Sequence, residues 1–207
     1  MRRKTEARRL SFVQAAGKLF IEHGFGTVTM EAIAAEAGAS KVTLYSYFPN
    51  KDELFGAFAA EAGKGVIETL ETSREEAGLQ ATLQRLGMAY LNLVTRPEVI
   101  NLNRLVIGEA GRYPQLSRIF YENGPRQTLI SICNVLDNLM QRGLLRQAEL
   151  RRTGLYFKAL CEAGLVERQL WGLDQQPAEE TRREAVDAAI EAFLPAYDAT
   201  QTHRHKG

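Results

Sequence analysis

The chain has 207 residues, of which 45% are hydrophobic and 25% are charged, and its formal net charge is +1. This composition is typical of a globular protein that is long enough to bury one sizeable core or two smaller ones. Because no run approaches the roughly 18 apolar residues of a membrane span, and no apolar signal-peptide block follows the basic start, we expect a cytoplasmic protein.

Charge is distributed unevenly along the chain. Residues 1–51 contain eight basic and four acidic side chains, a net charge of +4, whereas the remaining residues contain 18 basic and 21 acidic side chains, a net charge of −3. A basic segment joined to an acidic body is typical of a DNA-binding module attached to a domain with another task.

The N-terminal part is predicted to contain one long and two short helices. Apolar residues recur at intervals of three and four, and alternation of period two is nearly absent, so the sequence predicts an all-α fold. The first helix is expected over residues 4–23, and the short ones over 30–37 and 41–48. Thr29 and Ser40 are their expected N-caps, and Gly38 lies in the break between them.

The rest of the chain is predicted to be helical as well. A connector helix is expected over residues 51–72, because Asn50 can cap it and acidic residues occupy its first turn. Further helices are predicted over 80–94, 97–112, 114–122, 125–142, 149–171 and 178–197. We therefore expect a DNA-binding domain at 1–51, with a helix-turn-helix at 29–48, and a helical domain with another task at 52–207.

The two short helices have the layout of a helix-turn-helix. A helix that reads the major groove needs an apolar face that anchors it and a polar face that meets the DNA. In 41–48, Leu44 and Phe48 can supply the first face. A small helical hairpin without a DNA partner is the alternative that geometry leaves open. The residues that this geometry places toward DNA are Thr29, Ser40, Lys41, Thr43, Ser46, Tyr47 and Lys51.

Residues 29–34 (TMEAIA) and 37–54 (AGASKVTLYSYFPNKDEL) resemble the DNA-binding region of the TetR (tetracycline-repressor) family. The resemblance implies a homodimeric regulator, by family default a repressor, that leaves a palindromic operator when a small-molecule effector binds. It also implies that Tyr47 and Lys51 meet phosphates, that Lys41, Val42, Thr43 and Tyr45 lie near the bases, and that residues 52–207 form the effector-binding and dimerisation domain. Val42 departs from the pattern, since many relatives have Gly at this position.

The C-terminal part resembles a subset of the same family. Residues 104–110 (RLVIGEA), 113–116 (YPQL) and 120–125 (FYENGP) are similar to regulators of the AefR type. An effector pocket should be apolar with a few inward polar groups. The polar residues that could supply these groups are Tyr90, Arg104, Glu109, Tyr121, Asn134 and Asp137, and for each of them taken singly a surface or core role is the favoured alternative.

The last two predicted helices are candidates for a dimer interface. The helix over 149–171 has two apolar stripes, so one can face the core and the other a partner copy. The alternative is a central helix buried on both sides. The residues expected at the interface are Leu155, Ala159, Ala163, Val166, Leu170, Val186, Ile190 and Phe193.

The sequence argues against an enzyme. It has no phosphate-cradling Gly loop, no His-Glu-x-x-His motif and no nucleophile elbow, so no catalytic residue, cofactor or metal is expected. Cys133 and Cys161 lie in apolar helical runs and are expected in the core, with a redox pair as the alternative. The competing functions are an enzyme within the C-terminal domain, an architectural DNA binder, and an activator without a small-molecule inducer.

Overall fold

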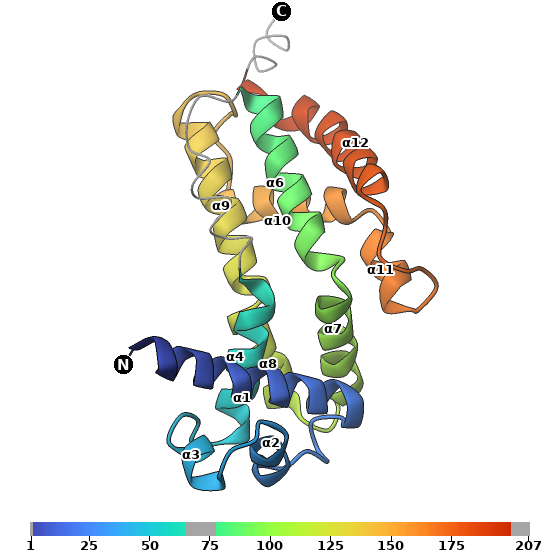
Figure 1. The fold of residues 1–207 in the computed structure, drawn as a ribbon. Helices are drawn as coiled ribbons and strands as arrows, with labels where there is room; N and C mark the ends of the chain where they lie inside the picture. The colour runs from blue at the N-terminus through green and yellow to red at the C-terminus, as the bar shows by residue number, and fades with distance from the viewer. Residues whose placement is uncertain (1, 65–77, 200–207) are drawn as a thin grey trace, which may run out of the picture. The chain divides into compact units, whose positions relative to one another are not determined.

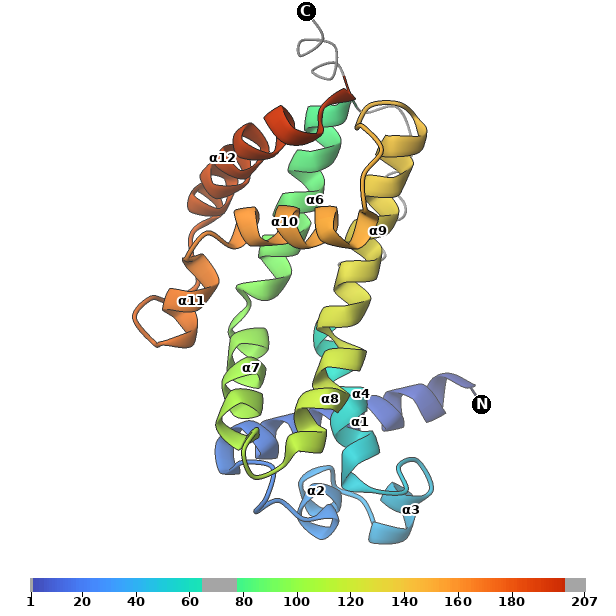
Figure 2. The same ribbon diagram turned by 180° about the vertical axis from the view of Figure 1, so that it is seen from behind.

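The computed structural model describes residues 2–64 and 78–199, with side chains from Thr5 onward. Within these ranges every regular element is a helix, so the predicted all-α fold is confirmed (Figures 1 and 2). None of these helices is long and apolar enough to cross a membrane. The helices are α1 (Arg2–His23), α2 (Met30–Glu36), α3 (Lys41–Tyr45), α4 (Lys51–Gly63), α6 (Leu79–Val94), α7 (Pro97–Glu109), α8 (Pro114–Asn123), α9 (Pro125–Gln141), α10 (Leu150–Glu162), α11 (Leu165–Leu170) and α12 (Glu179–Tyr197).

The chain forms two compact units. Of the described residues, the first unit contains 2–63 and 101–126, and the second contains 64, 78–100 and 127–199. This division differs from the boundary expected after residue 51, because α4 packs against α1 and against α8. The connector helix α4 ends at Gly63, Lys64 lies in a turn, and residues 65–72 of the predicted helix lie outside the described residues.

The first unit is built around aromatic side chains from α1, α4 and the loop after α1. The ring centroid of Phe20 lies 5.3 Å from that of Phe25 and 5.8 Å from that of Phe55. These three side chains are at most 2% exposed. Tilted and edge-on aromatic pairs add to the stability that apolar burial provides. The cluster therefore fixes α4 and the α1–α2 loop on α1, which supports the two short helices beside it (Figure 1).

The core of the second unit lies where α6, α10 and α12 pack on one another (Figure 2). Phe157 of α10 meets Phe193 of α12 edge-on at 5.3 Å, and Phe193 stacks on Tyr197 at 4.4 Å. Close approach of α6 to α12 requires a glycine. A Cβ at Gly87 would lie 2.6 Å from Cγ1 of Val186, whose side chain is fully buried.

The predicted helix over 149–171 is wrong as a single element. α10 ends at Glu162 and α11 begins at Leu165. Between them Ala163 has φ 30° and Gly164 has φ 88°, so both are in the left-handed region, which stops an α-helix. The apolar stripe expected along this segment is therefore interrupted at Ala163.

We expect Gly87→Ala to destabilise the second unit. The new methyl group would overlap the buried Val186, and overpacking of this kind costs about 1–3 kcal/mol of unfolding free energy. Gly108 of α7 is the matched control, because a Cβ there meets no atom within 4 Å. Gly108→Ala should leave the stability unchanged or raise it by up to about 1 kcal/mol. Urea unfolding of both variants checks this, and equal midpoints would refute the packing argument.

Candidate DNA-binding site

Both short helices begin at side-chain caps. The Thr29 hydroxyl accepts a hydrogen bond from the Ala32 N–H at 3.1 Å, and the Ser40 hydroxyl accepts one from the Thr43 N–H at 3.1 Å. Each cap satisfies a backbone donor that the first helical turn leaves without a partner. Gly38, with φ +59°, provides the left-handed residue that turns the chain from α2 toward α3. The predicted starts of both helices agree with these caps.

The recognition helix is shorter than predicted, since α3 ends at Tyr45 rather than Phe48. After Tyr45 the chain forms a tighter turn of the 3₁₀ type. In this turn the Tyr47 N–H donates to the Leu44 carbonyl, three residues back, at 3.0 Å. The Ser46 hydroxyl also donates to the Thr43 carbonyl, at 2.6 Å. Leu44 is 0% exposed and Phe48 is 4% exposed, so the predicted anchoring face is nevertheless formed.

The opposite side of this segment is exposed. Val42 is 80% exposed and Tyr45 is 41% exposed, which are high values for apolar and aromatic side chains. Ser40, Lys41 and Ser46 are exposed as well, as is Thr29 at the start of α2, and Thr43 is half-buried. The Lys41 amino group lies 5.6 Å from the Tyr45 ring and forms an ion pair with Glu31. The face thus offers methyl groups, hydroxyls and a cation, which suit base edges and phosphates.

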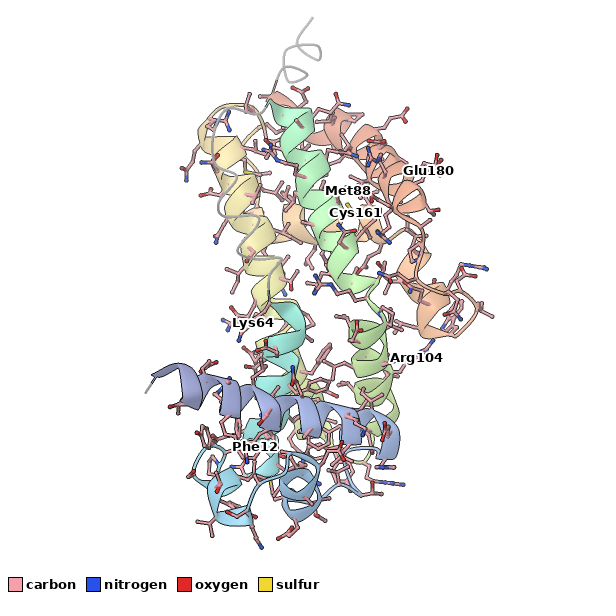
Figure 3. The ribbon with its side chains drawn as sticks, in the orientation of Figure 1. Phe12, Lys64, Met88, Arg104, Cys161 and Glu180 are labelled. Atoms are coloured by element: carbon pink, nitrogen blue, oxygen red, sulfur yellow. The ribbon has the colours of Figure 1, made fainter. Side chains whose placement is uncertain are left out.

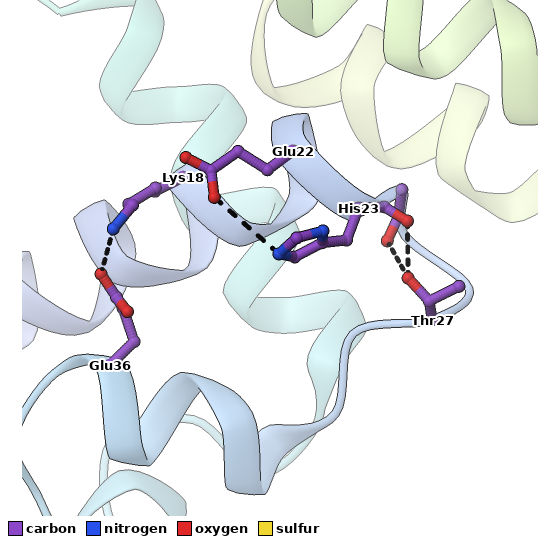
Figure 4. A network of polar contacts seen from close by, with 6 residues as sticks. Lys18, Glu22, His23, Thr27 and Glu36 are labelled. Atoms are coloured by element: carbon purple, nitrogen blue, oxygen red, sulfur yellow. Dashed lines mark hydrogen bonds and ion pairs between the residues drawn. The ribbon is translucent and has the colours of Figure 1, made fainter.

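Two basic side chains of α1 link this helix to α2. The Arg8 guanidinium donates to the Ala37 carbonyl at 3.3 Å and to the Gly38 carbonyl at 3.0 Å, and it lies over the Phe12 ring. Arg8 therefore caps the C-terminal end of α2, a role that its place among other basic residues did not reveal. Lys18 and Glu36 form a further α1–α2 link, an exposed ion pair at 2.7 Å (Figure 4).

Lys51 is engaged within the first unit. Its amino group donates to the Phe25 carbonyl at 2.7 Å and to the Val28 carbonyl at 2.8 Å, and it lies 4.3 Å from the Phe25 ring centroid. Partial burial lowers the pKa of Lys51. This side chain therefore holds the α1–α2 loop at the start of α4. Tyr47, the other expected phosphate ligand, is half-buried, with its ring 5.5 Å from that of Phe12.

The six candidate effector residues fall in both units. Arg104, Glu109 and Tyr121 belong to the first unit, while Tyr90, Asn134 and Asp137 belong to the second. Tyr90 is 1% exposed.

Tyr90 forms part of a partly buried polar network. Its hydroxyl donates to the Glu162 carboxylate, to which Lys158 also donates, at 2.9 Å. Burial raises the pKa of Tyr90, so its hydroxyl keeps its proton.

The residues expected at the dimer interface differ in exposure. Leu155 is 36% exposed, and Ala159 and Ala163 are exposed as well, whereas Val166 and Leu170 are partly buried. Val186, Ile190 and Phe193 are at most 3% exposed, because they form the core of their own unit. These last three side chains pack within their own chain. An apolar stripe in the sequence does not distinguish such packing from packing against a partner.

Both cysteines are free thiols. Cys161 is fully buried among the helices of the second unit (Figure 3), and burial raises its pKa to about 12. Cys133 is partly buried, and its pKa is raised for the same reason. Because the thiolate is the reactive form, neither thiol is activated at neutral pH.

Taken together, α1 to α3 are a helix-turn-helix unit with an anchored reading helix, joined to a second helical unit, and this defines a class of DNA-binding regulators. Comparison with known families gives the particular one. Residues 12–58 match the family model of bacterial regulatory proteins of the TetR family, and residues 81–199 match that of the AefR-like transcriptional repressor C-terminal domain. The chain belongs to the TetR family of transcriptional regulators, a family whose fold and function are not those of enzymes.

Individual relatives agree with this assignment. A TetR-family regulator from Mesorhizobium loti superposes with a TM-score of 0.81 at 28% identity, covering 93% of this chain and 98% of that one. The flavonoid-responsive regulator FrrA gives a TM-score of 0.76 at 29% identity with the same coverage. The nucleoid occlusion factor SlmA of a Marinomonas species is 27% identical over 158 residues, or 73% of each chain.

We expect Lys51→Met to lower the stability of the first unit. The variant keeps the apolar stem beside Phe25 but loses both hydrogen bonds to loop carbonyls, which costs about 1–3 kcal/mol. Lys64→Met removes the same charge from an exposed lysine just after α4, so it should lower the unfolding temperature by less than Lys51→Met does. Thermal unfolding followed by circular dichroism measures both. A wild-type Tm for Lys51→Met would show that the loop does not depend on this amino group.

Proposed function

We propose that this regulator binds a specific palindromic operator as a homodimer and leaves it when a small-molecule effector binds. The observation that carries the proposal is the exposed face of α3, where Val42 and Tyr45 stand in solvent while Leu44 is completely buried. Burying one side of so short a helix orients the other side for the major groove.

The alternatives fit these observations less well. An architectural binder draws its affinity from strong positive charge along the DNA backbone, whereas this chain has a net charge of only +1. An activator that needs no inducer remains the second candidate. Effector control is supported by FrrA, a relative of nearly equal length whose name describes it as flavonoid-responsive.

Selection of bound sequences from random DNA duplexes by the full chain tests the proposal. The selected sequences should share two inverted half-sites, spaced by about one helical turn or a multiple of it. A compound library screened for release of the selected duplex then tests effector control. Enrichment of no common sequence would contradict operator recognition.

We propose further that the exposed apolar residues of α10 contribute to the dimer. We expect Leu155→Asp to weaken self-association and operator binding together while the protomer stays folded, because Leu155 is 36% exposed. Ile190→Asp should instead unfold the second unit, since Ile190 is buried. Asn138→Asp, which adds the same charge at an exposed position of α9, is the control. Sedimentation velocity measures assembly, and a Leu155→Asp chain that remains dimeric would move the interface elsewhere.

Reading and positioning residues should behave differently on DNA. Thr43→Ala should lose roughly 1–3 kcal/mol of discrimination at defined operator positions, because a contact to a base edge disappears. Tyr47→Phe keeps the ring against Phe12 but removes a phosphate contact, so it should weaken selected and random duplexes by the same factor. Titrations on the selected operator, its point variants and random DNA compare the two. Equal losses for Thr43→Ala on all duplexes would reverse the assignment.

A further inference from the structure

Glu31 and Lys41 join the two helices of the DNA-binding motif at its exposed face. Glu31 lies in the first turn of α2, and Lys41 is the first residue of α3. Their side chains form an ion pair although each is more than half exposed, at 55% and 56%. Lys41 is also one of the residues expected near the bases. A carboxylate is thus bound to a cation that DNA recognition would use.

The pair persists around neutral pH. Its ammonium hydrogen bond lowers the pKa of Glu31 and raises that of Lys41, so both groups are charged over a wide range. Deprotonation of Lys41 or protonation of Glu31 therefore does not open the pair under ordinary conditions. Because the pair is exposed, water and salt ions weaken it, and a phosphate or a base edge is a further acceptor that can take the lysine from the carboxylate.

Such competition affects specific and random DNA differently. Binding to random DNA depends almost entirely on neutralising phosphates, so a lysine already neutralised by a carboxylate contributes less to it. The carboxylate itself also repels phosphates. At the correct base, by contrast, lysine gains acceptors in a fixed position, as at O6 and N7 of guanine. The ion pair should therefore penalise random DNA more than the operator.

We propose that Glu31 is a specificity-determining residue, which holds the Lys41 amino group so that it passes to DNA only where base acceptors replace the carboxylate. This inference rests on the proposed operator recognition. It concerns a side chain that does not itself have to touch the DNA, so Glu31 is a positioning residue.

The chain contains a matched control for this idea. Glu36 lies on the same helix and pairs with Lys18 of α1 at 2.7 Å (Figure 4). Lys18 is not among the residues expected to contact DNA. Glu31→Gln and Glu36→Gln therefore remove the same charge from the same helix, and only Glu31→Gln releases a lysine at the reading face.

The test compares full-length Glu31→Gln and Glu36→Gln with the wild type on the selected operator and on random duplex, over several salt concentrations. Glu31→Gln should raise affinity for random duplex by roughly two- to thirtyfold for a dimer, as expected when two exposed ion pairs are lost. Its salt dependence should steepen by about one charge per subunit. Operator affinity should rise less, so the specificity ratio falls. Glu36→Gln should change both affinities by one small, common factor.

A double-mutant cycle separates release of the lysine from a general change in charge. In a Lys41→Ala background, Glu31→Gln should no longer lower the specificity ratio. The proposal is overturned if the effect persists there, or if Glu31→Gln and Glu36→Gln change the two affinities by the same factors. If the wild type selects no sequence at all, operator recognition itself fails. If it does select one and Glu31→Gln leaves the ratio unchanged, only the role of Glu31 fails.

Discussion

The candidate DNA-binding surface depends on the burial of Leu44 and Phe48. A five-residue helix has almost no stability of its own, because nucleation costs more than one turn of hydrogen bonds returns. Packing of these two side chains into the core of the first unit, with exposures of 0% and 4%, holds α3 in place. The exposed face of α3 is therefore a consequence of the core beneath it, and a change in that core alters the geometry presented to DNA.

Lys51 links this core to the start of α4. Its amino group binds two carbonyls of the α1–α2 loop, whose Phe25 also packs against Tyr113, just before α8. Near the same loop, a Cβ at Gly24 would approach a carboxylate oxygen of Glu109 to 2.9 Å. The loop thus meets residues from both sequence segments of the first unit. Through these contacts, a displacement of residues 109–113 would shift the loop and, through Lys51, the start of α4.

The sequence predicted the helices and the anchoring face well, because both follow from local patterns. Thr29, Ser40 and Gly38 act within a few residues of themselves, so their roles can be inferred from composition and spacing. The break after Glu162 was missed because Ala163 is an ordinary helix former, and its left-handed conformation depends on the turn as a whole. The internal contacts of Arg8 and Lys51 were not foreseen for a related reason, since their partners are backbone carbonyls 30 and 26 residues away. An apolar stripe likewise cannot tell whether Val186 faces its own core or a partner.

Several basic side chains of the N-terminal segment already have partners within the chain. The net charge of this segment therefore overstates the positive charge that is available to DNA. Residues 1–51 have a net charge of +4, yet Arg8 and Lys51 bind carbonyls, and Lys18 and Lys41 bind carboxylates of α2. A cation that already has a partner must exchange it for a phosphate, so its gain on binding DNA is only the difference between two contacts. Formal charge therefore overstates the affinity of this unit for arbitrary DNA. On the proposed function, correctly placed base edges and a second half-site for a second copy of the chain would supply the contacts that arbitrary DNA lacks.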